Sequence, residues 1–343
     1  MGQVATRDRK RAYRASVDRA MGWILSHQEP DGSFGPVETM SHYMVLGASM
    51  LYTGHADAAA ALMRAMKALF VAQDGSFDAP EVRAGRKSAL LERGYAPAWV
   101  IYSSHVNLAY DISLRAMPHL LMLQDPVSGG MFGTGDDATR RKGIVNCAVT
   151  CVAGESALTT GYVAEAMRMG DHILNLVASN SDLGVCFYPI WDTERGLRTD
   201  VDAPASPNMP RVIERFGNNQ HHYLTGMMIA FLSDLYRVSG ESKYLDAALT
   251  VYEFAAGGSE EIYQTTLAHK FAWGSSWLYR TTQNAKHLES ACRVCDYLVA
   301  HQEKDGSFVH WALVKSADEW SYSPRLNITA QFALWISRTE ALL

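Results

Sequence analysis

Two nearly identical stretches, QEPDGSF at Gln28–Phe34 and QEKDGSF at Gln302–Phe308, lie near opposite ends of the 343-residue sequence. A shorter copy, QDGSF, occupies Gln73–Phe77, and weaker copies are GGMFG at Gly129–Gly133 and DLGVCF at Asp182–Phe187. Repetition at intervals of some tens of residues indicates a chain built from repeated structural units. We therefore expect one repeat architecture along the whole sequence.

Two kinds of helical segment alternate along the chain. In the first kind, apolar residues recur at i, i+3, i+4 and i+7 with charged residues between them, so one face is buried. The second kind is apolar on most sides, as in a helix surrounded by protein. The half-exposed segments are Ala15–His27, Asp57–Ala72, Asp111–Leu123, Tyr162–Ala178, Tyr244–Ala256 and Lys286–His301. The enclosed segments are Ser41–Leu51, Ala96–Val106, Ile144–Leu158, His221–Val238, Tyr263–Thr281 and Asn327–Thr339.

This alternation predicts a closed ring of helical hairpins, with the half-exposed helices outside and the enclosed helices inside. The inner-to-outer connections are short, for example TTG at Thr159–Gly161 and SGES at Ser239–Ser242, which makes consecutive helices antiparallel neighbours. The first helix is an outer one and the last an inner one, so the two can pair. We expect an all-α protein, an (α/α)6 toroid of six helical hairpins, with residues 1–343 in a single domain.

The repeated motif has a structural explanation. Its Asp can accept hydrogen bonds from backbone donors in a turn, and its Gly supplies a positive φ. The aromatic residue that follows can fold back between hairpins, and the preceding Gln can bond carbonyls left unpaired where an outer helix ends. We interpret Gln28, Asp31, Asp74 and Asp305 as structural rather than catalytic.

The composition narrows the classes of function. Charged residues make up 20% of the chain, the net charge is −5 and both signs are scattered, so we expect no nucleic-acid partner. No apolar run is long enough for a stable insertion into a membrane. The five cysteines are an odd number and most fall in predicted helices, which predicts reduced thiols in a cytoplasmic protein.

The pattern Q-x-x-D-G-x-aromatic in QEPDGSFG and QEKDGSF resembles the repeat signature of the terpenoid cyclase and protein-prenyltransferase toroids. The acidic D-x-D-D motif of cyclases that start by protonation is absent, and the nearest strings are DVD at Asp200–Asp202 and DD at Asp136–Asp137. The spacing of Asp, Cys and His that would place a prenyltransferase zinc is also absent. We therefore expect no metal and no other cofactor. A second group with this ring, the six-hairpin glycosidases and sugar epimerases, is echoed by SGESKYLDAALTVYEFA at Ser239–Ala255.

The chain is similar in length to the small single-domain toroid cyclases of terpenoid and polyketide biosynthesis. That resemblance implies an enzyme, a cyclase or isomerase that folds an apolar substrate for intramolecular C–C bond formation. A pericyclic reaction of the Diels–Alder type is one form of this chemistry and needs no aspartate. The alternatives are a sugar-active hydrolase or epimerase and a non-catalytic scaffold that binds a small molecule. The sequence leaves the oligomeric state open.

We predict the functional end to be the one that carries the long connections, because binding residues concentrate on loops at an open end. The side chains expected there are aromatic, histidine, amide and thiol groups that suit an apolar substrate. The predicted substrate-binding residues are His42, Tyr95, Trp99, His105, Asn146, Cys147, Asn219, Tyr223, Thr266, Trp273, Trp191 and Tyr322.

Three residues are candidates for polarising a substrate carbonyl, namely His222, Tyr102 and His269. His222 has a structural alternative, since the histidines of GNNQHHY at Gly217–Tyr223 can also bond loop carbonyls while Asn218 or Asn219 caps the helix. Lys270 can be a buried amine with a depressed pKa, or can extend to a surface carboxylate.

Cys147 and Cys151 share one helix face, and we interpret them as small buried apolar residues rather than a nucleophile or a metal pair. Glu155 continues that stripe and would need a partner. The segment 188–216 is predicted to be a long structureless loop and a candidate lid. Asp136 or Asp137 is predicted to cap a helix.

Overall fold

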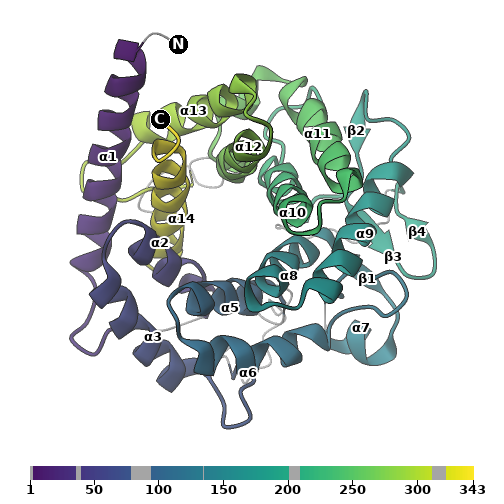
Figure 1. Cartoon of the computed structure of the whole chain (residues 1–343), viewed down its shortest axis with the longest axis horizontal. Coiled ribbons are helices and arrows are strands. Elements are labelled where there is room, and N and C mark those ends of the chain that lie inside the picture. The colour runs from purple at the N-terminus through teal and green to yellow at the C-terminus, as the bar shows by residue number, and fades with distance from the viewer. Residues whose placement is uncertain (1–2, 36–39, 79–93, 134, 201–208, 311–321) are drawn as a thin grey trace.

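Two concentric rings of helices form the body of the protein (Figure 1). A computed structural model describes residues 3–35, 40–78, 94–133, 135–200, 209–310 and 322–343, with the backbone alone for residues 3–5, 135, 136, 322 and 323. The outer helices are α1 (Gln3–Leu25), α3 (Ala56–Phe70), α6 (Tyr110–Leu121), α9 (Val163–Ser179), α11 (Ser242–Ala256) and α13 (Ala285–Ala300). The inner helices are α2 (Leu46–Tyr52), α5 (Ala96–Val106), α8 (Cys147–Thr160), α10 (Tyr223–Ser239), α12 (His269–Thr282) and α14 (Tyr322–Glu340). Outer and inner helices alternate along the chain, which confirms the predicted toroid of six hairpins.

The inner helices are enclosed, as the sequence predicts. Every residue of α8 from Cys147 to Ala157 is buried, and so is α10 from Leu224 to Ser233. The outer helices α3 and α9 are amphipathic and bury one face each. None of the helices in the part of the chain that the structure describes is long and apolar enough to cross a membrane.

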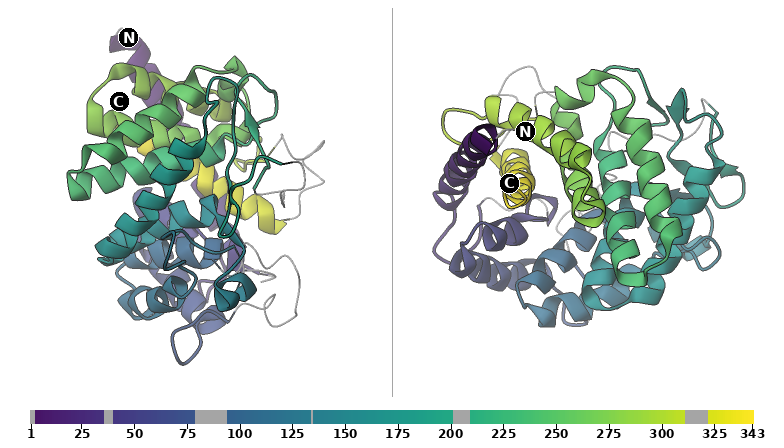
Figure 2. Two further views of the ribbon diagram at one scale, coloured as in Figure 1. Left: turned by 90° about the vertical axis from the view of Figure 1, so that its right-hand side faces the viewer. Right: turned by 45° about the horizontal axis from the view of Figure 1, so that its top comes forward.

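Small sheets lie at the end of the ring where outer helices lead into inner ones (Figure 2). Strands β1 (Ile144–Asn146), β3 (Ile190–Asp192) and β4 (Gly196–Leu197) form an antiparallel sheet in the order β1-β3-β4, with Val145 opposite Trp191 and Trp191 opposite Leu197. Strand β2 (Cys186–Phe187) pairs antiparallel with β5 (Ile213–Glu214). The short helix α7 (Gly135–Arg140) and the 3-10 turns η1 (Met40–His42), η3 (Glu260–Tyr263) and η4 (Thr266–Ala268) complete the connections.

These strands correct two predictions. The segment 188–216 is not a structureless loop, because β3, β4 and β5 tie it to β1 and β2. Residues 201–208, which complete the predicted lid, lie outside the described residues. The inner helix expected from Ile144 begins at Cys147, since Ile144–Asn146 pairs with β3 instead. The inner helix expected from His221 begins at Tyr223.

The repeated motif joins neighbouring hairpins. The Asp31 carboxylate accepts a hydrogen bond from the Ser33 backbone N–H at 2.9 Å, which fixes the turn as predicted. The Gln28 amide donates to the Gly32 carbonyl oxygen in its own turn at 3.1 Å and to the Ala58 carbonyl oxygen of α3 at 3.0 Å. The predicted partner of the glutamine, a carbonyl at the end of its own helix, is therefore wrong in detail. The side chain reaches forward and attaches one hairpin to the next.

The last copy of the motif closes the ring onto the first helix. The Gln302 amide donates to the Gly306 carbonyl oxygen at 2.8 Å and to the Ser16 carbonyl oxygen of α1 at 2.9 Å. Helix α1 also packs against α14, and the Arg14 guanidinium pairs with the Glu340 carboxylate at 3.0 Å. Figure 1 shows α1 and α14 side by side where the two ends of the chain meet. The predicted pairing of first and last helices is confirmed.

Helices α10 and α12 make the closest contact between inner helices. A Cβ on Gly226 would lie 2.1 Å from the Lys270 carbonyl oxygen, and a Cβ on Gly274 would lie 2.5 Å from the Gly226 carbonyl oxygen. Only glycine permits this approach of two backbones. As a consequence, the first turns of α10 and α12 bring Tyr223 and Lys270 together.

Candidate functional site

The most unusual side chain of the inner ring is Lys270, in the first turn of α12. It is 4% exposed, and its Nζ lies 3.0 Å from His269 Nε2. The faces of the Tyr223 and Tyr95 rings lie 5.3 Å and 6.0 Å from the same Nζ. Burial lowers the pKa of Lys270 to about 7. The amine is therefore largely uncharged just above neutral pH, which is the protonation state that nucleophiles and general bases need.

His269 fixes the hydrogen bonding of this amine. Its Nδ1 lies 2.8 Å from the Thr266 carbonyl oxygen, which can only accept, so Nδ1 carries the ring proton. Burial and the neighbouring Lys270 hold the pKa of His269 well below its usual value, so the ring stays neutral and Nε2 offers a lone pair. The Lys270 amine therefore donates to His269 Nε2.

A second histidine extends this group. The Thr266 hydroxyl lies 2.9 Å from His310 Nδ1, and the His269 and His310 rings are 5.7 Å apart. Burial lowers the pKa of His310 to about 3. We call Lys270, His269, His310, Tyr95 and Tyr223 the amine cluster; it combines α12, α10, α5 and the connection after α13.

Three tryptophans from three inner helices lie one turn further along the ring axis. The Trp273 and Trp335 rings stack at 4.8 Å with an interplanar angle of 14°, and Trp99 lies 5.5 Å from Trp273 and 6.0 Å from Trp335. All three are buried. Because α5 and α12 stand on opposite sides of the ring, this contact means that the indoles fill the axis. They form an apolar floor beneath the amine cluster.

The structure brings six of the predicted residues together around this floor, from three inner helices and the turn before α12. They are Tyr95, Trp99, Tyr223, Thr266, His269 and Trp273. Cys147 is close enough to Tyr223 to affect the pKa of its phenol, which burial raises. The close contact between helices α10 and α12 places Tyr223 of α10 beside the residues of α12.

Other predicted residues lie apart from the amine cluster. His222 is buried at the start of α10, where neither ring nitrogen has a hydrogen-bond partner among the described residues, and burial lowers its pKa to about 4. His105 bonds Ser113 of the outer helix α6 at 3.0 Å. Asn146 caps α8 by accepting from the Val149 backbone N–H at 3.1 Å.

Three more predicted positions are in the connections, and one is at the start of α14. The Asn219 backbone N–H donates to the Glu261 carboxylate at 2.6 Å. The Trp191 ring on β3 packs edge-on against His172 of the outer helix α9, at 5.8 Å. His42 lies in η1 before α2, and burial lowers its pKa to about 4. The Tyr322 side chain lies outside the described residues.

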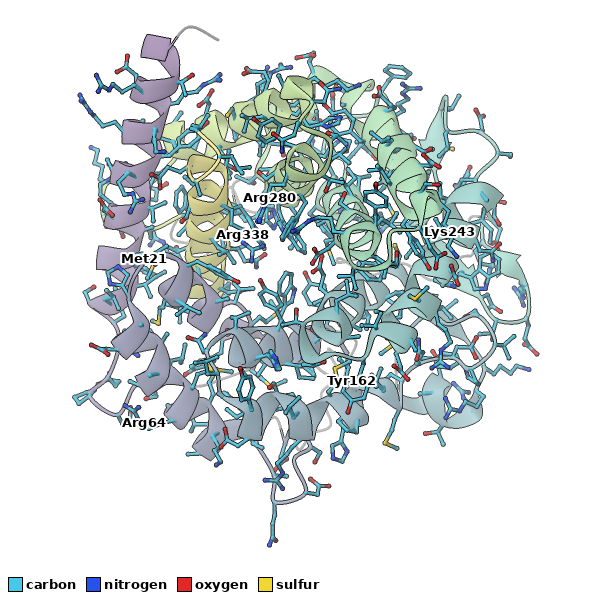
Figure 3. All side chains as sticks on the ribbon, in the orientation of Figure 1. Met21, Arg64, Tyr162, Lys243, Arg280 and Arg338 are labelled. Carbon is cyan, nitrogen blue, oxygen red and sulfur yellow. The ribbon has the colours of Figure 1, made fainter. Side chains whose placement is uncertain are left out.

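Tyr102 lies on the far side of the tryptophan floor, toward the short connections. Its hydroxyl accepts from the Arg338 guanidinium at 2.5 Å and lies 3.4 Å from the Tyr52 hydroxyl. Figure 3 shows Arg338 and Arg280 directed toward the middle of the ring at this end. Glu155 belongs to the same group, since Arg338 contributes to its electrostatic environment.

The sequence predicts that Glu155 needs a partner, but its Oε1 has no hydrogen bond to any residue that the structure describes. The carboxyl is 3% exposed, and burial raises its pKa well above the usual value. A protonated acid is less costly to bury than a carboxylate, which explains how the residue is tolerated. The ring therefore contains two distinct polar groups, separated by tryptophans.

Sequence reasoning singled out neither His310 nor Trp335. His310 follows the last motif directly, at a position where the sequence carries no helical pattern. Trp335 belongs to an enclosed helix whose sides all look apolar. The sequence does indicate the burial of Lys270, because a lysine within the apolar stretch of an enclosed helix has few ways to reach solvent.

The cysteines are buried free thiols. Burial raises the pKa of Cys292 to about 11 and holds that of Cys151 well above its usual value. Although Cys292 and Cys295 form a C-x-x-C pair, burial also raises the pKa of Cys295. In the described part of the chain, no three His, Cys, Asp or Glu side chains are placed to hold a metal ion.

We expect the thiols to resist modification in the folded protein, because the thiolate is the reactive form. In Ellman's assay at pH 8, Cys151, Cys292 and Cys295 should stay unmodified for hours. They should react at once in about 6 M guanidinium chloride, which unfolds all but hyperstable proteins. Fast reaction of Cys151 in the native protein would show that the interior is open to solvent at α8.

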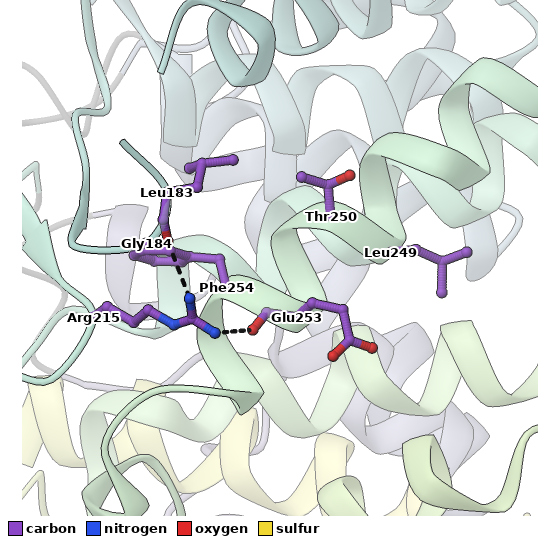
Figure 4. Close-up of a pocket in the computed structure, with 7 residues that line it drawn as sticks. All are labelled: Leu183, Gly184, Arg215, Leu249, Thr250, Glu253 and Phe254. Carbon is purple, nitrogen blue, oxygen red and sulfur yellow. Dashed lines mark hydrogen bonds between the residues drawn. The ribbon is translucent and has the colours of Figure 1, made fainter. Parts of the chain in front are cut away.

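Surface grooves between hairpins are distinct from the amine cluster. One of about 440 Å³ lies between the loop after α9 and helix α11 (Figure 4); its lining is Leu183, Gly184, Arg215, Leu249, Thr250, Glu253 and Phe254. The Arg215 guanidinium donates to the Leu183 carbonyl oxygen at 3.5 Å and to the Glu253 carbonyl oxygen at 3.3 Å. Arg215 thus joins two hairpins at the motif copy Asp182–Phe187, which has no glutamine to do so. Its role is structural.

Comparison with known proteins places this architecture among the toroids. No family model and no curated protein sequence matches the chain. Among solved structures, a D-mannose isomerase is similar with a TM-score of 0.63 and 12% identity, over 94% of this chain and 96% of that one. A family 76 α-mannanase from Bacteroides thetaiotaomicron has a TM-score of 0.64 and 13% identity, over 96% of each chain. The type II terpene cyclase MstE from Scytonema has a TM-score of 0.57 and 12% identity, over 97% of this chain and 99% of that one.

The fold is the α/α toroid. At 12–13% identity the comparisons establish this architecture and leave the reaction open. The same ring supports sugar isomerisation, glycoside hydrolysis and terpene cyclisation in these proteins. What this toroid does must therefore be argued from its own side chains.

Proposed function

We propose that this toroid is an enzyme, a cofactor-independent cyclase or isomerase that folds an apolar terpenoid- or polyketide-like substrate for intramolecular C–C bond formation. The observation that supports it is the joint presence of a tryptophan floor and one uncharged amine in the middle of the inner ring. Indole surfaces bind an apolar chain through contact area. The structural similarity to the terpene cyclase MstE is consistent with this substrate class.

The mechanism we propose is preorganisation. Trp99, Trp273 and Tyr95 come from opposite sides of the ring, so a flexible chain held on them loses conformers that cannot react. Both ring nitrogens of His269 are already hydrogen-bonded, so the predicted role of His269 as a donor to the substrate passes to the amine that it holds in place. Lys270 has a further N–H that can orient a substrate carbonyl and stabilise negative charge as it develops on oxygen. Because an apolar interior contains little competing water, this donor acts more strongly than it would at the surface.

A second function, isomerisation of a sugar, is favoured by a different observation. The histidines and the lysine of the amine cluster can move protons next to a carbonyl, and a D-mannose isomerase shares the toroid fold. Glycoside hydrolysis needs two carboxyl groups flanking a bond. Within the described residues, the amine cluster has no such pair.

The test begins with the molecule that copurifies with the protein, identified by mass spectrometry after extraction. An apolar polyene or polyketide supports the proposal, and a sugar supports the isomerase. With that substrate class in hand, Trp273→Leu should reduce the rate of product formation by about tenfold or more, since a loosened fit of reacting groups costs orders of magnitude.

Trp277→Leu is the matched control, because Trp277 stands on the same helix α12 but packs between Arg237 and Arg280 at the opposite end. It should leave the rate within about twofold, as expected of a residue outside the reaction geometry. Equal rates for both variants and the native protein would contradict the assignment of the tryptophan floor as the substrate surface.

A further inference from the structure

Within the described part of the chain, the Lys270 amine has no acidic partner. Among the described residues, its recorded neighbours are a neutral imidazole and two tyrosine rings, and burial is the cause of its depressed pKa. A lysine that merely filled space would extend its ammonium to water or to a carboxylate. Keeping an amine in an apolar interior costs stability, so its retention calls for a chemical reason.

The geometry directs the free lone pair of this amine away from His269. One N–H of Lys270 donates to His269 Nε2 at 3.0 Å, which occupies that side of the nitrogen. The Tyr95 and Tyr223 ring faces flank the other sides at 6.0 Å and 5.3 Å. The Tyr223 hydroxyl lies 3.4 Å from His221 Nδ1, and burial raises the pKa of this phenol, so it keeps its proton. A nucleophile, a proton acceptor and a proton donor are thus in one place.

We propose that Lys270 forms an imine with the carbonyl group of an aldehyde or ketone substrate. The inference rests on the proposed function and narrows its substrate class to carbonyl compounds. Desolvated lysines are the side chains that carry out this reaction in proteins.

The step balances without an oxidant or a reductant. The Nζ lone pair attacks the carbonyl carbon, and the C=O π pair moves to oxygen, which takes a proton from the Tyr223 hydroxyl. His269 Nε2 accepts a proton from the nitrogen. The C–O bond of the resulting amino alcohol then breaks, the oxygen leaves as water with the proton that His269 returns, and a protonated C=N bond remains beside the Tyr223 phenolate. Transfer of the nitrogen proton to this phenolate restores Tyr223 and gives the neutral imine. The net change is amine plus carbonyl giving imine plus water. A protonated imine withdraws electrons more strongly than a carbonyl, which activates the adjoining unsaturated chain for C–C bond formation.

Reductive trapping tests this proposal on the native chain. The protein is incubated with benzaldehyde, an apolar aldehyde, and sodium cyanoborohydride, which reduces imines, and the modified lysines are located by peptide mass spectrometry. We expect a benzyl adduct on Lys270 whose formation rises through pH 7. The groups that face this amine from neighbouring elements are His269 and His310, both neutral there, and the protonated phenols Tyr95 and Tyr223.

Lys243 is the internal comparison. Its ammonium is exposed and paired with Asp171 and Glu241, both at 2.9 Å, and these carboxylates raise its pKa. At pH 7.5, Lys270 should be labelled at least about tenfold faster than Lys243, since the amine that is less protonated reacts first. Lys270→Arg should remove the Lys270 adduct and leave the labelling of Lys243 unchanged.

The proposal is overturned if Lys270 stays unlabelled in the folded protein while the same peptide is labelled in urea. That result would leave the proposed cyclase or isomerase function standing, because the Trp273→Leu comparison judges it independently. Conversely, an adduct on Lys270 together with unchanged activity of Lys270→Arg would separate the amine from the reaction and also refute the imine as an intermediate.

Discussion

Replacing Lys270 by methionine is expected to make the folded protein more stable at pH 6, by about 3 to 5 kcal/mol, because a depressed pKa is a cost of folding at 1.36 kcal/mol per unit. Folding lowers the pKa of this lysine from 10.5 to about 7. Between those two values the unfolded chain holds the proton and the folded chain does not. The contribution of Lys270 to the free energy of unfolding therefore rises as the pH increases from about 7 to 10.5. This contribution is lowest below pH 7.

Methionine fills the same space without a charge, so its advantage should be full at pH 6 and nearly absent at pH 10. Urea unfolding of both proteins at pH 6, 8 and 10 measures the difference between their free energies of unfolding. Titrating groups that the two proteins share contribute equally to both values and drop out of this difference. Lys243→Met, at an exposed ion pair, should show no comparable pH dependence. A Lys270→Met protein that is less stable than the native one at pH 6 would show that the amine contributes to the fold, and the chemical reason for keeping it would disappear.

The second large effect concerns the loop that closes the ring. Gly306→Ala should lower the free energy of unfolding by about 3 kcal/mol or more, because strained backbone and overpacking add. Gly306 has a φ of +94°, and a Cβ there would lie 2.4 Å from the Arg19 carbonyl oxygen of α1. The added methyl group cannot be accommodated unless the Gln302 loop and α1 separate.

Gly22→Ala is the matched control on the other side of the same contact. Gly22 lies within α1, and a Cβ there would have no atom within 4 Å. Alanine should therefore raise the stability by about 0.5–1 kcal/mol through helix propensity alone. Chemical unfolding of the two variants should move in opposite directions. If Gly306→Ala unfolds at the native urea concentration, the close approach of this loop to α1 is wrong.

Much of the fold could be predicted from the sequence because its cause is local. DGSF fixes a turn through its own Asp and Gly, and each copy follows an amphipathic helix, so the order of outer and inner helices can be inferred from periodicity. The strands could not be predicted this way. Ile144 and Val145 are apolar and lead directly into α8, and Ile144–Asn146 becomes β1 because Ile190–Asp192 lies beside it. Such a partner, distant in sequence, leaves no periodic signal.

The candidate site was predictable in its composition and less so in its geometry. The aromatic and histidine content of the inner helices was evident, and Trp99, Trp273 and Tyr223 do meet around the axis. Which of His222 and Tyr223 faces Lys270 depends on a rotation of about 100° per residue, which sequence spacing alone does not set. Among the residues that the structure describes, the neighbours of Lys270 from α5 and α10 are tyrosines rather than acids. The sequence could not show this, because it follows from the packing of Gly226 against α12.

The attachment of α1 to α13 and α14 also determines the order of events during translation. Tyr13 and Val17 of α1 leave the ribosome well before α13 and α14, the helices that cover them, are synthesised. The nascent chain must therefore carry an uncovered apolar stripe until those helices emerge, a period in which chaperones or aggregation compete for it. In this architecture the contact of α1 with α13 and α14 is the step of biogenesis that is most exposed to failure.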